Sequence, residues 1–234
     1  MKLLLTSATS ALGKRVAAEL GERHHLRLTD RAMAEMPGEY AVSPQEHDAS
    51  TNLLVRGIDA IVVAAEPLQD EGAVEYLDAM TRNLYNLLMA AYQEGVKRVV
   101  YLSTLELMTA YGPEFVVTER WRPRPTTEPQ LLGKHLGEYV CREFAREHKL
   151  TVVVLRLGTV VAPSEQAGDS IDPIWLDQRD LGLAIEGALT AEVRNWTVVH
   201  VQGKQAGARF PVGDAEKWIG FAPIVDFSVP PHMH

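Results

Sequence analysis

Residues 6–13 carry the sequence TSATSALG, a run of small and hydroxyl side chains between an apolar stretch and an amphipathic pattern. Ser7, Ser10 and Gly13 recur at intervals of three residues, a spacing that glycines have in the turn of a dinucleotide-binding βαβ unit. The glycines of such a turn make a tight bend, let the backbone approach a pyrophosphate and let the helix pack on the strand. Only the last of the three is a glycine here, so Ser7 must form the bend and Ser10 must face the phosphate.

The two serines weaken the prediction of a phosphate site without removing it. A residue other than glycine at positive φ costs on the order of 1–3 kcal/mol, whereas the N-terminus of a helix still attracts an anion. The alternative is a plain strand–turn–helix connection in which Ser10 caps the helix. The predicted cofactor contacts of the turn are Ser7, Thr9, Ser10, Ala11, Leu12 and Gly13.

Asp30 follows the second apolar run, at residues 26–29. A carboxylate at this strand end accepts hydrogen bonds from an adenosine ribose and repels a 2′-phosphate, so it favours NAD over NADP. Arg31 is the next residue and weakens that preference because its charge attracts a phosphate. The alternative role for Asp30 is that of a turn residue after a strand.

Gln130 and Lys134 lie four residues apart in a helical pattern from about residue 128 to 148, so their side chains share one face. Glutamine does not titrate and therefore cannot act as a general acid or base. With Thr127 and Pro129, Gln130 fits a capping box at the start of the helix. One interpretation of Lys134 is an ion pair with Glu138 on a solvated face.

Short β-branched runs alternate with longer amphipathic patterns, which is typical of a parallel sheet with crossover helices. Strands are predicted at residues 3–6, 26–29, 60–64, 99–103, 152–157 and 197–201, and helices at about residues 13–20, 74–94, 128–148 and 176–189. The predicted fold class is α/β, a Rossmann-like doubly wound parallel sheet. Residues 1–203 are expected to form this domain, with residues 204–234 as a small C-terminal cap.

The 234-residue chain has a formal net charge of −8, which argues against a nucleic-acid partner because such partners bind basic surfaces. No apolar stretch approaches the ~20 residues of a membrane span, and the N-terminal run is too short for a signal peptide. We therefore expect a cytoplasmic protein without a membrane partner. Cys141 is the only cysteine, and His24-His25 lacks further ligands at metal spacing, so no metal site is predicted.

The landmarks of the chain follow one another in the order found in a known family. Beyond the first turn they are GIDAIVVAA at 57–65, NLYNLL at 83–88, GVKRVVYLST at 95–104, LRLGTV at 155–160 and WIGFAP at 218–223. Together they resemble the extended short-chain dehydrogenase/reductase superfamily, and within it the NAD-dependent epimerase/dehydratase family. The short length and the segment at residues 175–181 look most similar to its uronate-dehydrogenase-like members.

This resemblance implies a set of site residues. In that family a Tyr-x-x-x-Lys pair exchanges a proton with the substrate hydroxyl during hydride transfer; Lys134 matches the lysine, while Gln130 stands at the tyrosine position. Lys134 is then a contact of the nicotinamide ribose as well as a catalytic residue. Thr104 or Ser103 is the implied hydroxyl partner, although Leu105 stands near the key position, and Tyr111 from the following loop is a candidate substitute phenol.

Further contacts follow from the same resemblance. Asp48 and Ala64 correspond to cofactor contacts, and Glu66, Arg156 and Trp175 to substrate contacts. Two of these have alternatives, because Asp48 also fits a solvated loop and Arg156 a structural ion pair. The resemblance also implies a homodimer formed by the long helices around Asn83 and Lys134.

The sequence therefore predicts an NAD(P)-binding protein with an atypical active site, an oxidoreductase acting on a hydroxyl of a small sugar or sugar acid. The cofactor is NAD rather than NADP. The alternative is a catalytically inactive dinucleotide-binding sensor or scaffold, or, if the altered turn binds no dinucleotide, a structural subunit without a cofactor. An enzyme needs a titratable group beside the nicotinamide, whereas a sensor needs affinity alone.

Overall fold

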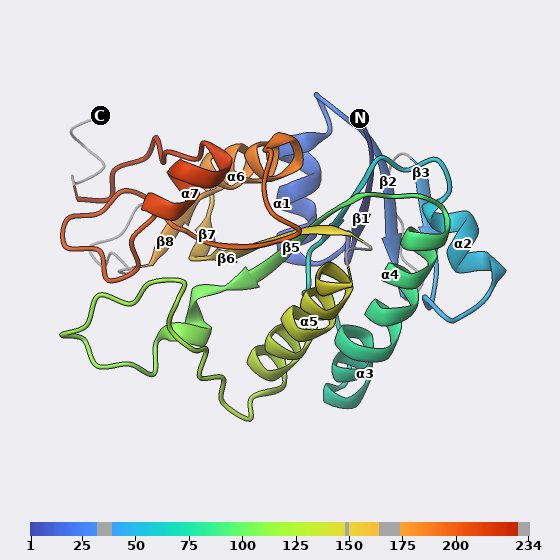
Figure 1. Cartoon of the computed structure of the whole chain (residues 1–234), viewed down its shortest axis with the longest axis horizontal. Helices are drawn as coiled ribbons and strands as arrows, with labels where there is room; N and C mark the ends of the chain where they lie inside the picture. Colours follow the sequence, from blue (N-terminus) through green and yellow to red (C-terminus); the bar gives the residue numbers. More distant parts are fainter. Residues whose placement is uncertain (32–38, 148–149, 164–173, 229–234) are drawn as a thin grey trace.

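A sheet of seven parallel strands forms the centre of the protein (Figure 1). The structure is a computed structural model, and it describes residues 1–31, 39–147, 150–163 and 174–228. The strand order β3-β2-β1-β4-β5-β6-β9 reverses direction between β1 and β4. The strands are β1 (Lys2–Thr6), β2 (His25–Asp30), β3 (Glu39–Val42), β4 (Ala60–Val63), β5 (Arg98–Thr104), β6 (Thr151–Leu157) and β9 (Trp196–Val201).

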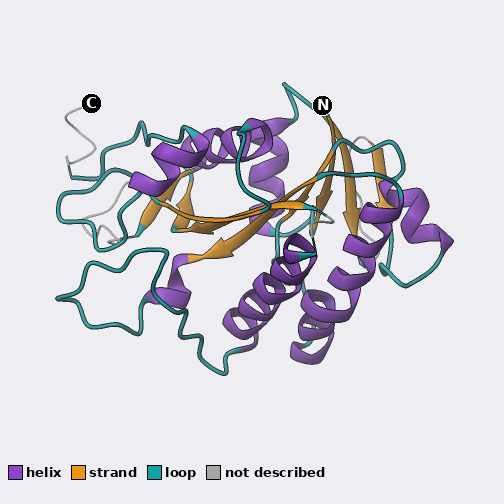
Figure 2. Cartoon of the chain, viewed as in Figure 1, coloured by secondary structure: helices purple, strands orange, loops and turns teal. Residues whose placement is uncertain are grey.

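Helices cover both faces of this sheet (Figure 2). One core cluster packs α1, α6 and α7 on one face, and a second packs α2, α3, α4 and α5 on the other. The helices are α1 (Ala11–Leu20), α2 (Ala49–Val55), α3 (Ala73–Asp78), α4 (Leu84–Gln93), α5 (Pro129–Arg146), α6 (Gln178–Thr190) and α7 (Gly213–Ile219), with a π-helical turn η1 (Ala79–Asn83) and a 3₁₀ turn η2 (Leu105–Met108).

The apolar runs of the sequence form strands because both of their faces are buried. Leu3 and Leu5 of β1 belong to the cluster under α1 and α6, whereas Leu4 between them belongs to the opposite cluster. A central parallel strand therefore has no polar face, and its sequence shows a continuous apolar run rather than an alternating one. The carboxyl ends of β1, β4, β5 and β6 meet at one edge of the sheet, where the site lies.

The chain after β9 packs on the α6 side of the fold. Ile219 and Phe221 join the core cluster of α1 and α6. The Asp180 carboxylate of α6 accepts hydrogen bonds from the backbone N–H groups of Ile224 (2.8 Å) and Val225 (3.1 Å). A separate two-stranded parallel sheet, β7 (Thr159–Val161) and β8 (Trp175–Asp177), lies beside this segment. The division at residue 203 stays a prediction.

The predicted fold class is confirmed, and each predicted strand and helix is present with its ends displaced by at most two residues. The sequence analysis missed β3, α2, β7, β8 and α7. These elements have only three to seven residues, too few to show a periodicity. Among the described residues, no helix is long and apolar enough to cross a membrane.

The predicted capping box of α5 is wrong. The helix begins at Pro129, so Glu128 is its N-cap and Thr127 lies outside the helix. Glu128 makes no side-chain capping bond, and its own N–H donates to the Thr126 hydroxyl at 3.2 Å. Pro129 nevertheless takes the first-turn position that its fixed φ favours.

Candidate cofactor and substrate site

A cavity of about 230 Å³ opens at the carboxyl ends of the central strands. The reversal of strand order beside β1 makes this edge the place where doubly wound sheets bind ligands. Five predicted site residues meet in this cavity: the first two residues of α1, Glu66 in the segment after β4, the last residue of β5 and a lysine of α5. The cavity is lined by Ala11, Leu12, Arg15, Glu66, Ser103, Thr104, Glu106, Lys134, Leu157, Gly158, Thr159 and Val160.

The turn between β1 and α1 is held by the two serines that replace glycines. Ser7 has a φ of 47°, the left-handed conformation that the bend requires. The Ser10 hydroxyl donates to the Ser7 carbonyl (2.7 Å) and accepts the N–H of Gly13 (3.0 Å), so it caps α1. A Cβ at Gly13 would lie 2.1 Å from the Ser7 carbonyl oxygen, and glycine there is therefore a packing requirement.

Asp30 is the last residue of β2 and lies beside this turn. Its Oδ2 accepts the N–H of Thr9 at 3.1 Å, while its Oδ1 makes no hydrogen bond with any described residue. The carboxyl group is fully buried, and burial raises its pKa, an effect that the Thr9 hydrogen bond partly opposes. A buried acceptor without a donor is unfavourable, so this atom suits a ribose hydroxyl.

Arg31 forms an ion pair across the ends of two strands. Its Nε and Nη2 donate to the Glu71 carboxylate at 2.9 and 2.7 Å, and its Nη1 donates to the Ser7 hydroxyl at 3.2 Å. Both charged side chains are only 9% exposed. The pair thus joins the end of β2 to the segment after β4, and sequence reasoning gave no sign of it because the two residues are far apart in the chain.

Lys134 of α5 reaches into the cavity and pairs with Glu66. Its Nζ donates to Oε1 of Glu66, with side chains that are 11% and 25% exposed, respectively. The interpretation that Lys134 pairs with Glu138 on a solvated face is therefore wrong. Glu138 is buried and pairs with Arg156 instead.

Two glycines let α5 approach the sheet closely enough to place Lys134. A Cβ at Gly133 would lie 2.5 Å from the Tyr76 ring, and one at Gly137 would lie 2.1 Å from the Tyr101 hydroxyl. That hydroxyl donates to the Lys134 carbonyl at 3.1 Å. Both tyrosines are buried, and burial raises the pKa of each phenol well above its usual value.

The candidate hydroxyl groups lie at the end of β5. Thr104 lines the cavity and caps η2, its Oγ1 accepting the N–H of Glu106 at 3.2 Å. Ser103 also lines the cavity and donates to Oε1 of Glu138 at 2.6 Å. Leu105 is completely buried. The Thr104 hydroxyl hydrogen is therefore the one that can point toward a ligand.

Tyr111 is not brought to the cavity. Its hydroxyl donates to the Arg122 carbonyl at 2.7 Å, its ring packs edge-on against Trp121, and the Arg124 guanidinium lies 4.2 Å from the ring centroid. Gln130 is exposed in the first turn of α5. The role of Tyr111 as a substitute phenol stays a prediction, and this geometry does not favour it.

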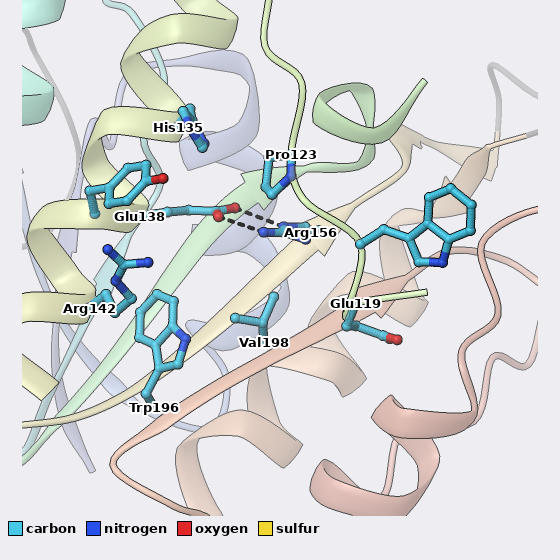
Figure 3. A pocket seen from close by; sticks show the side chains of 10 residues that line it. Glu119, Pro123, His135, Glu138, Arg142, Arg156, Trp196 and Val198 are labelled. Atoms are coloured by element: carbon cyan, nitrogen blue, oxygen red, sulfur yellow. Dashed lines mark hydrogen bonds and ion pairs between the residues drawn. The ribbon is translucent and has the colours of Figure 1, made fainter. Parts of the chain in front are cut away.

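Arg156 faces a second cavity, of about 140 Å³, between α5, β6 and β9 (Figure 3). Glu138 and Arg156 point toward each other there, with Nε to Oε1 at 3.0 Å and Nη2 to Oε2 at 2.8 Å. This bidentate contact is the structural ion pair that was the alternative to a substrate role for Arg156. The second cavity is lined by Glu119, Trp121, Pro123, His135, Glu138, Tyr139, Arg142, Arg156, Trp196 and Val198.

Three further predicted contacts, Trp175, Asp48 and Ala64, are not among the residues that line the cavity. Trp175 begins β8 and packs edge-on against Phe227 at 5.7 Å. Asp48 is exposed and caps α2 by accepting the N–H groups of Ser50 and Thr51, and the Ser50 hydroxyl bond holds its pKa below the usual range. Ala64 is fully buried directly after β4. The substrate role of Trp175 and the adenine role of Asp48 stay predictions.

The residues present fit a nicotinamide dinucleotide. The first turn of a helix presents unpaired amide N–H groups to an anion, and Ala11 and Leu12 of that turn line the cavity. Asp30 supplies an acceptor for ribose hydroxyls on one side of the turn, and Lys134 supplies a cation on the other. Within the described ranges, no cluster of three or more metal-ligating side chains occurs.

The sequence pattern of the NAD dependent epimerase/dehydratase family matches residues 3–186. The chain belongs to this family. Its relatives include a uronate dehydrogenase of Pseudomonas syringae pv. tomato, which is 28% identical over 204 residues that span 85% of the chain and 73% of the relative.

Solved structures agree with the fold. A uronate dehydrogenase from Agrobacterium tumefaciens, in a variant with a tyrosine replaced by alanine and complexed with NAD, has a TM-score of 0.75 and 21% identity, with 96% of the chain and 85% of that structure covered. MoeE5 in complex with UDP-glucuronic acid and NAD has a TM-score of 0.76 and 19% identity, with 98% and 96% covered. At these identities the likeness is one of fold.

Three residues that line or border the cavity were not predicted from the sequence. Glu106 and Arg15 line it directly, and Glu71 holds Arg31 beside it. A signal existed for Glu106, which follows the predicted strand at 99–103 by three residues. No local signal marks Glu71, because its partner comes from another strand end.

Proposed function

We propose that the protein is an NAD-dependent oxidoreductase that oxidises a hydroxyl group of a sugar or sugar acid. The observation that carries this proposal is the single cavity shared by the start of α1, Thr104 and Lys134. An anion site, a hydroxyl and a cation at the switch point of the sheet are the parts that hydride transfer from an alcohol needs. The uronate dehydrogenases among the relatives suggest the substrate class.

Each residue has a defined task in this proposal. The N-terminus of α1 binds the pyrophosphate, and Asp30 accepts the hydroxyl groups of the adenosine ribose. Lys134 binds the nicotinamide ribose, and Thr104 donates its hydroxyl hydrogen to the substrate oxygen. The bound dinucleotide supplies the hydride acceptor. Asp30 also disfavours a 2′-phosphate, so NAD is preferred to NADP.

Calorimetric titration and turnover test the proposal together. We expect the purified protein to bind NAD more tightly than NADP and to form NADH with glucuronate or UDP-glucuronate. Lys134→Met should abolish turnover because the cavity loses its ammonium group. Lys97→Met is the matched control, since Lys97 is exposed in the loop before β5. Failure to bind either dinucleotide at millimolar concentration contradicts the proposal, as does binding without turnover of any sugar or sugar acid.

We also propose that two copies pair through the outer face of α4 and α5. Tyr85 is 47% exposed and Tyr139 36%, and Tyr85, Val140 and Phe144 line a shallow cavity on this face. Light scattering should give twice the 25.9 kDa mass of the chain, and Tyr85→Glu should shift the protein to monomer. A monomer at micromolar concentration of the unaltered chain contradicts the pairing.

A further inference from the structure

No tyrosine is among the described residues that line the cavity, but several titratable side chains are. Four titratable side chains line it among the described residues: Arg15, Glu66, Glu106 and Lys134. Arginine stays protonated in proteins, and the lysine ammonium group is the ion-pair partner of Glu66. A proton leaving a substrate hydroxyl therefore has two acceptors to choose from, Glu66 and Glu106.

Glu66 is the better placed of the two carboxylates. Glu106 is an exposed residue of η2, whereas the Glu66 side chain is only 25% exposed. Ala65 before it adopts a φ of 50°, which turns the chain at the end of β4. The Ser7 hydroxyl then donates to the Glu66 carbonyl at 3.0 Å. The base of the side chain is thus fixed against the phosphate turn.

The head of the Glu66 side chain is fixed as well. Lys134 Nζ contacts Oε1, and no described residue donates to Oε2. An ionised carboxylate is an acceptor only, so Oε2 is the atom that can receive a hydrogen bond from a hydroxyl in the cavity. Thr104 lines the same cavity; its Oγ1 already accepts one N–H, which leaves its hydrogen for the substrate oxygen.

We infer that Glu66 is the proton acceptor of this site, in place of the tyrosine that Gln130 replaces. The inference rests on the proposed function. As the substrate O–H bond breaks, its proton passes to Oε2 of Glu66 and the C=O bond forms. The electron pair of the adjacent C–H bond leaves with its hydrogen as hydride to the nicotinamide of NAD⁺. Lys134 holds the carboxylate in place, and Thr104 stabilises the substrate oxygen.

The test compares three variants for NAD affinity and for NADH formation with glucuronate and UDP-glucuronate. Glu66→Gln keeps the size of the side chain but cannot accept the proton, so kcat should fall by about 10²–10⁴-fold. The Kd for NAD should stay within about threefold, and the acidic limb of the pH profile of kcat should disappear. Glu66→Asp keeps a carboxylate and should retain partial activity. Glu128→Gln is the matched control, because Glu128 is exposed and makes no side-chain capping bond.

Each other outcome has a defined meaning. If Glu66→Gln keeps its kcat and its pH profile, the inference is wrong and the proposed function stands. If that variant is folded by circular dichroism but has lost NAD affinity, Glu66 is a binding residue and the inference is also wrong. If the unaltered protein binds NAD but forms no NADH with any sugar substrate, the proposed function fails, and the assignment of Glu66 fails with it.

Discussion

At the scale of single residues, the hydroxyl groups of the phosphate turn are used within the chain. Ser10 caps α1, and Ser7 bonds to the segment after β4. Ser10 thus stabilises the start of α1, whereas Ser7 takes a positive φ of 47° that glycine would adopt at lower cost. Under the proposed function a pyrophosphate approaches the backbone at this turn, so the stability that Ser10 gives to α1 and the affinity for the dinucleotide compete there.

Ser10→Gly tests that competition. Replacing a serine cap with glycine costs only a few tenths of a kcal/mol of stability, while removal of Cβ lets the backbone approach the pyrophosphate. We expect NAD to bind about tenfold more tightly, which corresponds to about 1.4 kcal/mol or one regained hydrogen bond. Ser10→Ala is the control: it should cost about 1 kcal/mol in unfolding free energy without the gain in affinity. Calorimetry and urea unfolding measure the two effects, and equal affinities for the two variants would contradict the prediction.

His200 predicts a pH dependence of stability. Burial lowers its pKa to about 3, with Arg156 adding to the effect, and both of its ring nitrogens lack a hydrogen-bond partner among the described residues. The unfolded chain therefore binds this proton at higher pH than the folded one. This contribution to stability is complete above about pH 6.5 and is lost as the pH falls toward 3, with a limiting slope of about 1.4 kcal/mol per pH unit.

The variant His200→Gln isolates this contribution. The difference in unfolding free energy between the variant and the unaltered protein should shrink steadily from pH 7 to pH 4 in urea titrations. The buried Asp180 carboxyl group, whose pKa is raised by burial and which bonds to Ile224 and Val225, titrates in both proteins and cancels in the difference. A difference that does not change with pH would show that His200 makes no such contribution.

At the scale of elements, the position of Lys134 depends on the contact between α5 and the sheet. Gly137→Ala places a Cβ 2.1 Å from the Tyr101 hydroxyl, and overpacking of a buried contact costs about 1–3 kcal/mol. We expect lower stability in urea unfolding together with weaker NAD binding, because the displaced helix carries Lys134 with it. In Gly213→Ala the new Cβ meets nothing within 4 Å, and this control should change neither property.

Elements that show a periodicity could be predicted from the sequence. The buried strands and the helices α1, α5 and α6 each carry a repeated apolar pattern, so their places along the chain follow from residue spacing. The first residue of α5 could not be predicted in detail, because Thr127, which lies outside the helix, fits the sequence pattern of a capping box. The contacts of the site could not be predicted from the sequence either. The Lys134–Glu66 and Arg31–Glu71 pairs join residues that are 68 and 40 positions apart, and such pairs leave no local sequence pattern.

At the scale of the whole molecule, the order of the strands determines where chemistry can occur. Seven parallel strands place all of their carboxyl ends on one edge, so the segments after β1, β2 and β4 meet although they lie far apart in sequence. Asp30 was predicted from its place at a strand end, whereas Thr104 and Lys134 were predicted from the family resemblance. Thr104 and Lys134 line one cavity. The strand order alone does not determine where Arg156 points, since a strand alternates its side chains between two faces. Arg156 is buried against Glu138 of α5 and does not line this cavity.

The ion pair between Arg31 and Glu71 has a kinetic consequence. Asp30 is fully shielded from solvent, so an incoming adenosine ribose reaches it only after neighbouring groups have moved, and the adjacent bidentate pair resists that movement. Binding should then occur in two steps, with an observed association rate that levels off at high NAD concentration. In stopped-flow experiments Glu71→Gln should raise that plateau, whereas Glu94→Gln, which weakens the exposed pair with Arg56, should not. At high NAD concentration, the rate of cofactor binding would then be set by the opening of the protein and not by the concentration of NAD.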